Sequence, residues 1–160
     1  MEKITCSEIA YLLAYPVRVN ELTPYWLAEI IARGRMIHQR LGFDNIKSFQ
    51  RILKLNSESI LIVGLPDRID NNFCYEFKTF SRRTRKKVVK CGEIQCKCYT
   101  FITGLPSKLV LYDVEKEKIV SEKIIKYSPK EFKRIVKKAL QIQKLIREFK
   151  QTYKKIQNGV

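Results

Sequence analysis

Two carboxylates and an amine lie close together in the middle of this 160-residue sequence. Asp67 belongs to the run GLPDRID, between an apolar segment and a turn, and Glu76 and Lys78 follow in the run YEFKTF. Side chains two apart on a β-strand point to the same face, so Glu76 and Lys78 should be neighbours. Two carboxylates that converge across a turn suit a hard cation such as Mg²⁺ or Mn²⁺. With a lysine to orient water or offset charge on a phosphate, this arrangement suits the hydrolysis of phosphodiester bonds.

Three other polar residues could belong to the same site. His38 is the only histidine and lies near the end of a predicted helix. A lone helical histidine is more often structural, but as a ligand it would favour Mn²⁺ over Mg²⁺. Gln95 and Tyr99 stand four apart, on one face of a later predicted helix. Alone they are ordinary helix residues, whereas beside a metal–phosphate site they could hold DNA or position a ligand.

The charge of the chain points to a polyanionic partner. Lys and Arg number 32 against 16 acidic residues, which gives a formal net charge of +16 and a pI near 9.8. Such an excess favours nucleic acid through counterion release and steering. One segment concentrates the positive charge, and it can be interpreted equally as a basic flap leading to the site or as a solvated loop. Its cations are Arg82, Arg83, Arg85, Lys86 and Lys87.

Helices and strands of both kinds must position these residues. Helical spacing predicts helices over residues 7–13, 24–41, 88–102 and 129–156. The predicted N-caps are Ser7, Thr23 and Ser128, with Pro24 and Pro129 at first helical positions and Gly42 and Gly104 as stops. Alternating or short apolar runs predict strands over residues 49–55, 60–63, 73–80, 109–114 and 118–126. The Asp70-Asn71-Asn72 turn predicts that strands 60–63 and 73–80 form an antiparallel hairpin.

The composition fits a single folded domain over residues 1–160, with 45% hydrophobic residues and few Gly and Pro. The five cysteines do not suggest a disulfide framework, so we expect a reducing, cytoplasmic environment. Their spacing matches no usual zinc pattern and favours small buried core residues. They are Cys6, Cys74, Cys91, Cys96 and Cys98. No signal peptide or membrane-spanning run is visible, so no membrane partner is expected, although the basic C-terminal helix could touch anionic lipid.

The ordered motifs resemble the RecB-type branch of the PD-(D/E)XK nucleases. The matching pieces are GRMIHQ with His38, GLPD with Asp67, EFK with Glu76 and Lys78, and QCKCY with Gln95 and Tyr99. The similarity is greatest to the CRISPR-associated RecB-like exonucleases and their relatives in archaea and archaeal viruses, and it spans roughly residues 7–112.

The resemblance implies a restriction-endonuclease-like α/β core, in which helices flank a mixed sheet over residues of about 24–126. It also implies that His38, Asp67, Glu76 and the backbone carbonyl of Phe77 bind Mn²⁺ or Mg²⁺, and that Lys78 is catalytic. Gln95 and Tyr99 would form the accessory motif of this branch. The expected reaction is hydrolysis of DNA, often as an exonuclease on single strands.

One departure from the family is evident. Its members often hold an iron–sulfur cluster on four cysteines, one of them in a Tyr-x-x-Cys-Pro-Arg stretch near the N-terminus. Here Tyr15 stands where that cysteine would fall, and no cysteine follows Cys98. We therefore expect no iron–sulfur cluster, which leaves strand unwinding and polarity open.

Two other functions are compatible with the same residues. A structure-specific or resolvase-like endonuclease would need a symmetric dimer, for which the long amphipathic helix over residues 129–156 could supply an interface. A protein that retains the fold and binds DNA without cutting it is the other possibility.

Overall fold

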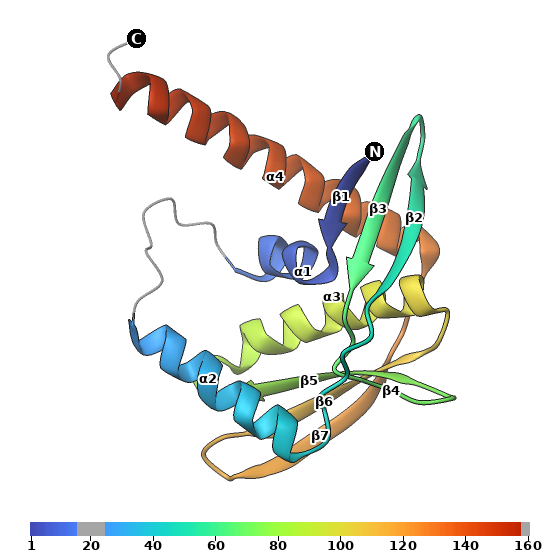
Figure 1. The fold of residues 1–160 in the computed structure, drawn as a ribbon, viewed down its shortest axis with the longest axis vertical. Coiled ribbons are helices and arrows are strands. Elements are labelled where there is room, and N and C mark those ends of the chain that lie inside the picture. The colour runs from blue at the N-terminus through green and yellow to red at the C-terminus, as the bar shows by residue number, and fades with distance from the viewer. Residues whose placement is uncertain (16–24, 158–160) are drawn as a thin grey trace.

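A computed structural model describes residues 1–15 and 25–157 and shows a mixed α/β protein, as predicted (Figure 1). Most boundaries fall within three residues of the predicted ones, and β1 and β4 are additional. The elements follow in the order β1 (Glu2–Thr5), α1 (Cys6–Ala14), α2 (Tyr25–Arg40), β2 (Phe49–Leu55), β3 (Glu58–Gly64), β4 (Arg68–Ile69), β5 (Cys74–Phe80), α3 (Arg85–Thr103), β6 (Ser107–Asp113), β7 (Lys118–Ile125) and α4 (Pro129–Gln157).

The strands lie in two mixed sheets rather than in one. The first has the order β1-β3-β2, with β1 parallel and β2 antiparallel to β3. The second has the order β4-β5-β6-β7, and only its central pair, β5 and β6, is parallel. The predicted hairpin of strands 60–63 and 73–80 is therefore wrong, because β3 pairs within the first sheet. The predicted turn is present but joins β4 to β5, and the Asp70 carboxylate accepts from the N–H groups of Asn72 and Phe73 at 2.8 Å.

Helix α3 lies between the two sheets and contacts both of them (Figure 1). It packs on β5 and β6 of one sheet and on β2 and β3 of the other, and α1 lies against it as well. The helix begins at Arg85, three residues before the predicted start, because the turn at Ser81 and Thr84 continues directly into it. It ends as predicted at Gly104, whose φ of 77° is the left-handed conformation that favours glycine.

The other face of β5 packs against α2. Tyr75 and Phe77 point to this side and form a cluster with Val110 and the α2 residue Ile37. Helix α2 ends near the predicted stop, and Gly42 has a φ of 77°. The predicted N-cap Thr23 and the adjacent Pro24 lie outside the described residues. Alternation along β5 thus leaves Glu76 and Lys78 on the α3 side, as the two-residue period predicts.

The caps of the other two helices differ in how well they were predicted. Helix α1 starts one residue earlier than expected, and its N-cap is Thr5 rather than Ser7. Glu8 N–H donates to Thr5 Oγ1 at 3.1 Å, and Thr5 N–H donates to Glu8 Oε2 at 2.8 Å. This reciprocal capping box satisfies two backbone donors at once. Helix α4 begins as predicted, with Glu131 N–H donating to Ser128 Oγ at 3.4 Å.

The five cysteines are free and buried, as expected for core residues. The N-terminal half of α4 buries Phe132, Val136 and Ala139 against α1 and α3, and its C-terminal half extends beyond the body of the protein (Figure 1). No helix in the described residues is both long and apolar enough to cross a membrane.

The end of β3 leaves no room for a side chain at Gly64. An added Cβ there would lie 2.5 Å from Cys6 Sγ and 2.8 Å from Ile102 Cδ1. We predict that Gly64→Ala lowers the free energy of unfolding by about 1–3 kcal/mol, because the core must shift to admit the methyl group. Urea unfolding followed by circular dichroism measures the change. Gly34→Ala is the matched control, since its Cβ would meet only Thr79 Oγ1, at 3.5 Å, and it should leave stability equal or slightly higher. Equal stability of both variants would contradict the steric argument.

Candidate active site

Glu76 and Lys78 form an ion pair between β5 and α3. Lys78 Nζ lies 2.5 Å from Glu76 Oε1. The Glu76 side chain is 2% exposed and that of Lys78 is 19% exposed, so solvent reaches the pair only from the amine side. Gly92 of α3 covers the lysine, and a Cβ there would lie 3.2 Å from Lys78 Cγ. The second carboxylate oxygen, Glu76 Oε2, is buried with no hydrogen-bond partner within the described structure.

Burial and neighbouring charges set the protonation of this pair. Loss of solvent and the negative charge of Asp67 raise the pKa of Glu76 above its ordinary value, whereas the ammonium of Lys78 opposes this and favours the carboxylate. For Lys78, burial lowers the pKa, but the Glu76 carboxylate outweighs that effect and the pKa lies above its ordinary value. Lys78 therefore keeps its proton at neutral pH, and it can act as a cation and hydrogen-bond donor but not as a base.

Asp67 comes directly before β4 in the chain and is hydrogen-bonded to the edge of β5. Its N–H donates to the carbonyl of Tyr75 at 3.0 Å, and its Oδ2 accepts from the N–H of Phe77 at 2.7 Å. The carboxylate thus occupies the place of a neighbouring strand. Because the N–H and C=O of a residue in a strand point to the same side, the carbonyl of Phe77 faces the same edge.

His38 comes from α2 and reaches the other oxygen of Asp67. Its Nδ1 lies 3.5 Å from Asp67 Oδ1, and both side chains are about three-quarters buried. The imidazole stands edge-on to the ring of Phe77, with 4.7 Å between centroids. The structure therefore brings together four of the predicted site residues, from α2, the β3–β4 connection and β5.

Asn45 is a positioning residue that the sequence analysis missed. Its N–H donates to the carbonyl of Asp67 at 3.0 Å, and its side-chain amide donates to the carbonyl of Pro66 at 2.8 Å. These bonds tie the segment after α2 to the turn that holds Asp67, which brings His38 and Asp67 together. Asparagine in a loop commonly bonds to nearby backbone, but no sequence signal points to a partner 21 residues away.

Gln95 and Tyr99 lie in the interior, 4% and 2% exposed. The Tyr99 hydroxyl donates to the carbonyl of Leu65 at 3.1 Å, two residues before Asp67. Gln95 Nε2 lies 3.4 Å from that hydroxyl and 3.3 Å from Ser7 Oγ on α1. The pair, four apart as predicted, therefore connects α1, α3 and the turn of Asp67.

The predicted basic flap is a turn followed by the first turn of α3. Its five cations, Arg82, Arg83, Arg85, Lys86 and Lys87, are exposed, and no ion pair found within the described residues includes them. They follow β5 directly, so the helix N-terminus adds its partial positive charge to theirs.

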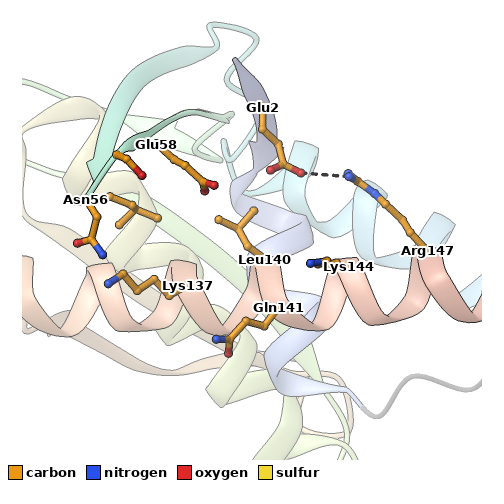
Figure 2. A pocket seen from close by; sticks show the side chains of 10 residues that line it. Glu2, Asn56, Glu58, Lys137, Leu140, Gln141, Lys144 and Arg147 are labelled. Atoms are coloured by element: carbon orange, nitrogen blue, oxygen red, sulfur yellow. Dashed lines mark hydrogen bonds and ion pairs between the residues drawn. The ribbon is translucent and has the colours of Figure 1, made fainter.

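A pocket of about 600 Å³ lies away from these residues (Figure 2). It is formed by β1, the β2–β3 turn and α4, and charges of both signs line it, including the pair of Arg147 and Glu2 at 3.2 Å. The length of β3 separates this turn from Gly64, roughly 20 Å at the rise of a strand. The pocket is therefore no part of the candidate active site.

The donor set of the site fits a hard divalent cation. No three His, Cys, Asp or Glu side chains in the described part of the chain form a preassembled metal cluster, and one oxygen of Glu76 is paired with Lys78. Glu76 Oε2 nevertheless has no hydrogen-bond partner within the described structure, and Asp67 is bonded to Tyr75 and Phe77, the residues on either side of Glu76. Carboxylate and carbonyl oxygens with one imidazole suit Mg²⁺ or Mn²⁺.

Comparisons with known proteins give structural relatives only. No family model and no curated protein matches the sequence. The fold is similar to the crystal structure of SSO0001, with a TM-score of 0.63 and 16% identity over 89% of this chain and 77% of that one. At such identity the likeness establishes a shared fold. An alkaline exonuclease (LHK-Exo) from Laribacter hongkongensis matches with a TM-score of 0.47 and 13% identity over 96% of this chain and 94% of that one. Its complex with dAMP gives 0.48 and 14% over the same shares.

Asp67 accepts a hydrogen bond from Phe77 N–H, and this structural role can be tested apart from its negative charge. We predict that Asp67→Ala lowers the free energy of unfolding by about 1–2 kcal/mol, because a part-buried N–H loses its acceptor. Asp67→Asn keeps an oxygen at that place and should cost less than half as much. Urea unfolding of both variants tests this difference. Equal losses would show that the backbone bond does not depend on the side-chain oxygen.

Proposed function

We propose that this protein is a DNA nuclease that hydrolyses phosphodiester bonds with Mn²⁺ or Mg²⁺, as an exonuclease on single strands or linear ends. The carrying observation is the buried Glu76 carboxylate, which has one oxygen on Lys78 and the other without a partner, beside Asp67. A buried carboxylate with an unused oxygen is costly for a fold, and a cation would compensate it. The motif order of the RecB-type PD-(D/E)XK nucleases supports the same proposal.

Asp67, Glu76, His38 and the carbonyl of Phe77 would hold the ion. Such an ion, when bound, polarises the phosphodiester and makes water a better nucleophile at neutral pH. The hydrogen bonds of Asp67 to Tyr75 and Phe77 hold its carboxylate at the edge of β5. Lys78, protonated and partly exposed, would orient the attacking water or offset the charge that builds on the phosphate.

The remaining residues of the proposal serve the substrate and the geometry. A net charge of +16 favours a polyanion, and the five cations at the start of α3 would bind the DNA backbone as it passes the end of β5. Gln95 and Tyr99 would act from the interior by fixing the turn that carries Asp67.

We predict that the purified protein shortens end-labelled linear DNA with Mn²⁺ or Mg²⁺ and not with EDTA. Glu76→Gln and Lys78→Ala should each lower the cleavage rate by about 100-fold or more, because each removes a charge at the reacting phosphate. Arg82→Ala is the comparison variant and should weaken DNA binding at low salt while leaving the rate at saturating DNA within about threefold. Undiminished cleavage by Glu76→Gln would assign the activity to a contaminant or another site.

A structure-specific endonuclease acting as a dimer is the second candidate. One observation favours it: the exposed end of α4 carries an apolar stripe, with Leu145 63% and Ile156 71% exposed. An exposed apolar face on a helix is typical of an interface.

Circular DNA and light scattering separate the two candidates. An exonuclease needs an end, so we predict that closed circles survive conditions that degrade linear DNA and that the protein scatters as a monomer. Cutting of circles by a dimer would instead support the endonuclease. Binding of DNA with no cleavage under any metal condition would favour a protein that binds without cutting.

A further inference from the structure

An aromatic pair at the end of α1 takes no part in the interactions described so far. The rings of Tyr11 and Tyr15 stack, with 5.2 Å between centroids and 28° between planes. Tyr15 is partly buried against the core, whereas Tyr11 is 54% exposed. One ring thus supports the other, and the outer ring offers a flat apolar surface to solvent.

Tyr11 shares a face of α1 with Ser7, and Ser7 contacts α3 through Gln95. Ser7 and Tyr11 are four apart on α1 and therefore lie on one face. Ser7 Oγ accepts from Gln95 Nε2, and Gln95 Oε1 in turn accepts from Cys91 Sγ, one turn earlier on α3. The residue after Cys91 is Gly92, which covers the side chain of Lys78. This face of α1 is therefore directed to the part of α3 that lies over the Glu76–Lys78 pair.

Burial raises the pKa of Tyr15 to about 12, so its phenol stays neutral at ordinary pH and adds no charge to the stack.

We propose that Tyr11, supported by Tyr15, is a stacking platform for an unpaired nucleobase next to the phosphate that is cleaved. The substrate would then be a single strand or a frayed end. This inference rests on the proposed nuclease function and narrows its substrate. Bases inside a duplex have both faces covered by their neighbours, whereas an unpaired base has a free face that an aromatic ring can cover. Such stacking tolerates any base, which suits an enzyme that degrades DNA without regard to sequence.

A cycle that removes the ring and the base separately tests the platform. The substrates are a labelled single-stranded oligonucleotide and a series in which one abasic site is moved along the strand near the end. The proteins are the full-length wild type, Tyr11→Ala and Tyr11→Phe. We expect Tyr11→Ala to lower kcat/KM on the intact strand by about tenfold, the size of one base–aromatic stack. On the strand whose abasic site falls at the platform, Tyr11→Ala should cause no further loss, because the two changes remove the same contact.

Tyr11→Phe controls for the ring itself. It keeps the stacking surface and loses only the hydroxyl, so its kcat/KM should stay within about twofold of the wild type. The assay can therefore distinguish this variant from the loss of about tenfold expected for Tyr11→Ala. Thermal unfolding of each variant checks that the fold is intact. Equal losses by Tyr11→Ala on intact and abasic strands at every position, or no loss on either, would overturn the platform while leaving the nuclease in place. Failure of the wild type to cleave or bind any strand would instead overturn the proposed function, and this inference with it.

Discussion

The site depends on the burial of a carboxylate and an amine between β5 and α3. A buried ion pair contributes little net stability, because desolvation offsets most of the attraction, yet removal of one partner costs about 3–5 kcal/mol. The fold is therefore more stable with both Glu76 and Lys78 than with either one alone. Glycine at position 92 is what lets α3 lie directly over the lysine, since a Cβ there would also meet Leu109 Cδ1 at 2.5 Å. The close packing of α3 at Gly92 and the burial of the Glu76–Lys78 pair therefore depend on each other.

The second carboxylate reaches the pair because the chain crosses from one sheet to the other at this place. β3 ends at Gly64 in the first sheet, and β4 begins at Arg68 in the second. Asp67 lies in the crossing and takes over the hydrogen bonds of the missing edge strand beside β5. Asn45 secures the same turn from the other side, next to the end of α2. A short irregular segment is thus held by hydrogen bonds to β5 and to Asn45, which suits the preorganised ligand set that we propose.

The sequence predicted well wherever the signal was local. The end of α3 followed from Gly104 and the start of α4 from Ser128, and the two-residue period placed Glu76 and Lys78 on one face. The errors came from partners distant in the chain. The predicted hairpin joined two apolar runs that are neighbours in the sequence. In the structure β3 pairs instead with β1, whose four residues are too few to show an alternating pattern. Thr5 displaced Ser7 as the N-cap because Glu8 stands three residues after Thr5 and completes a capping box.

Gln95 and Tyr99, which the resemblance assigns to an accessory motif, lie in the interior of the protein. Polar residues on a helix next to the proposed nuclease site would suggest contacts with DNA, yet side chains that are 4% and 2% exposed cannot reach a phosphate outside. Their hydrogen bonds instead run to α1 through Ser7 and to the turn of Asp67 through the carbonyl of Leu65. We infer that Gln95 and Tyr99 set the position of the turn that carries Asp67, one of the proposed metal ligands. The same link couples α1, and with it the tyrosine pair at its end, to the turn that carries Asp67. Spacing in the sequence predicts that Gln95 and Tyr99 are neighbours, but only the packing of α3 between two sheets decides that they face inward.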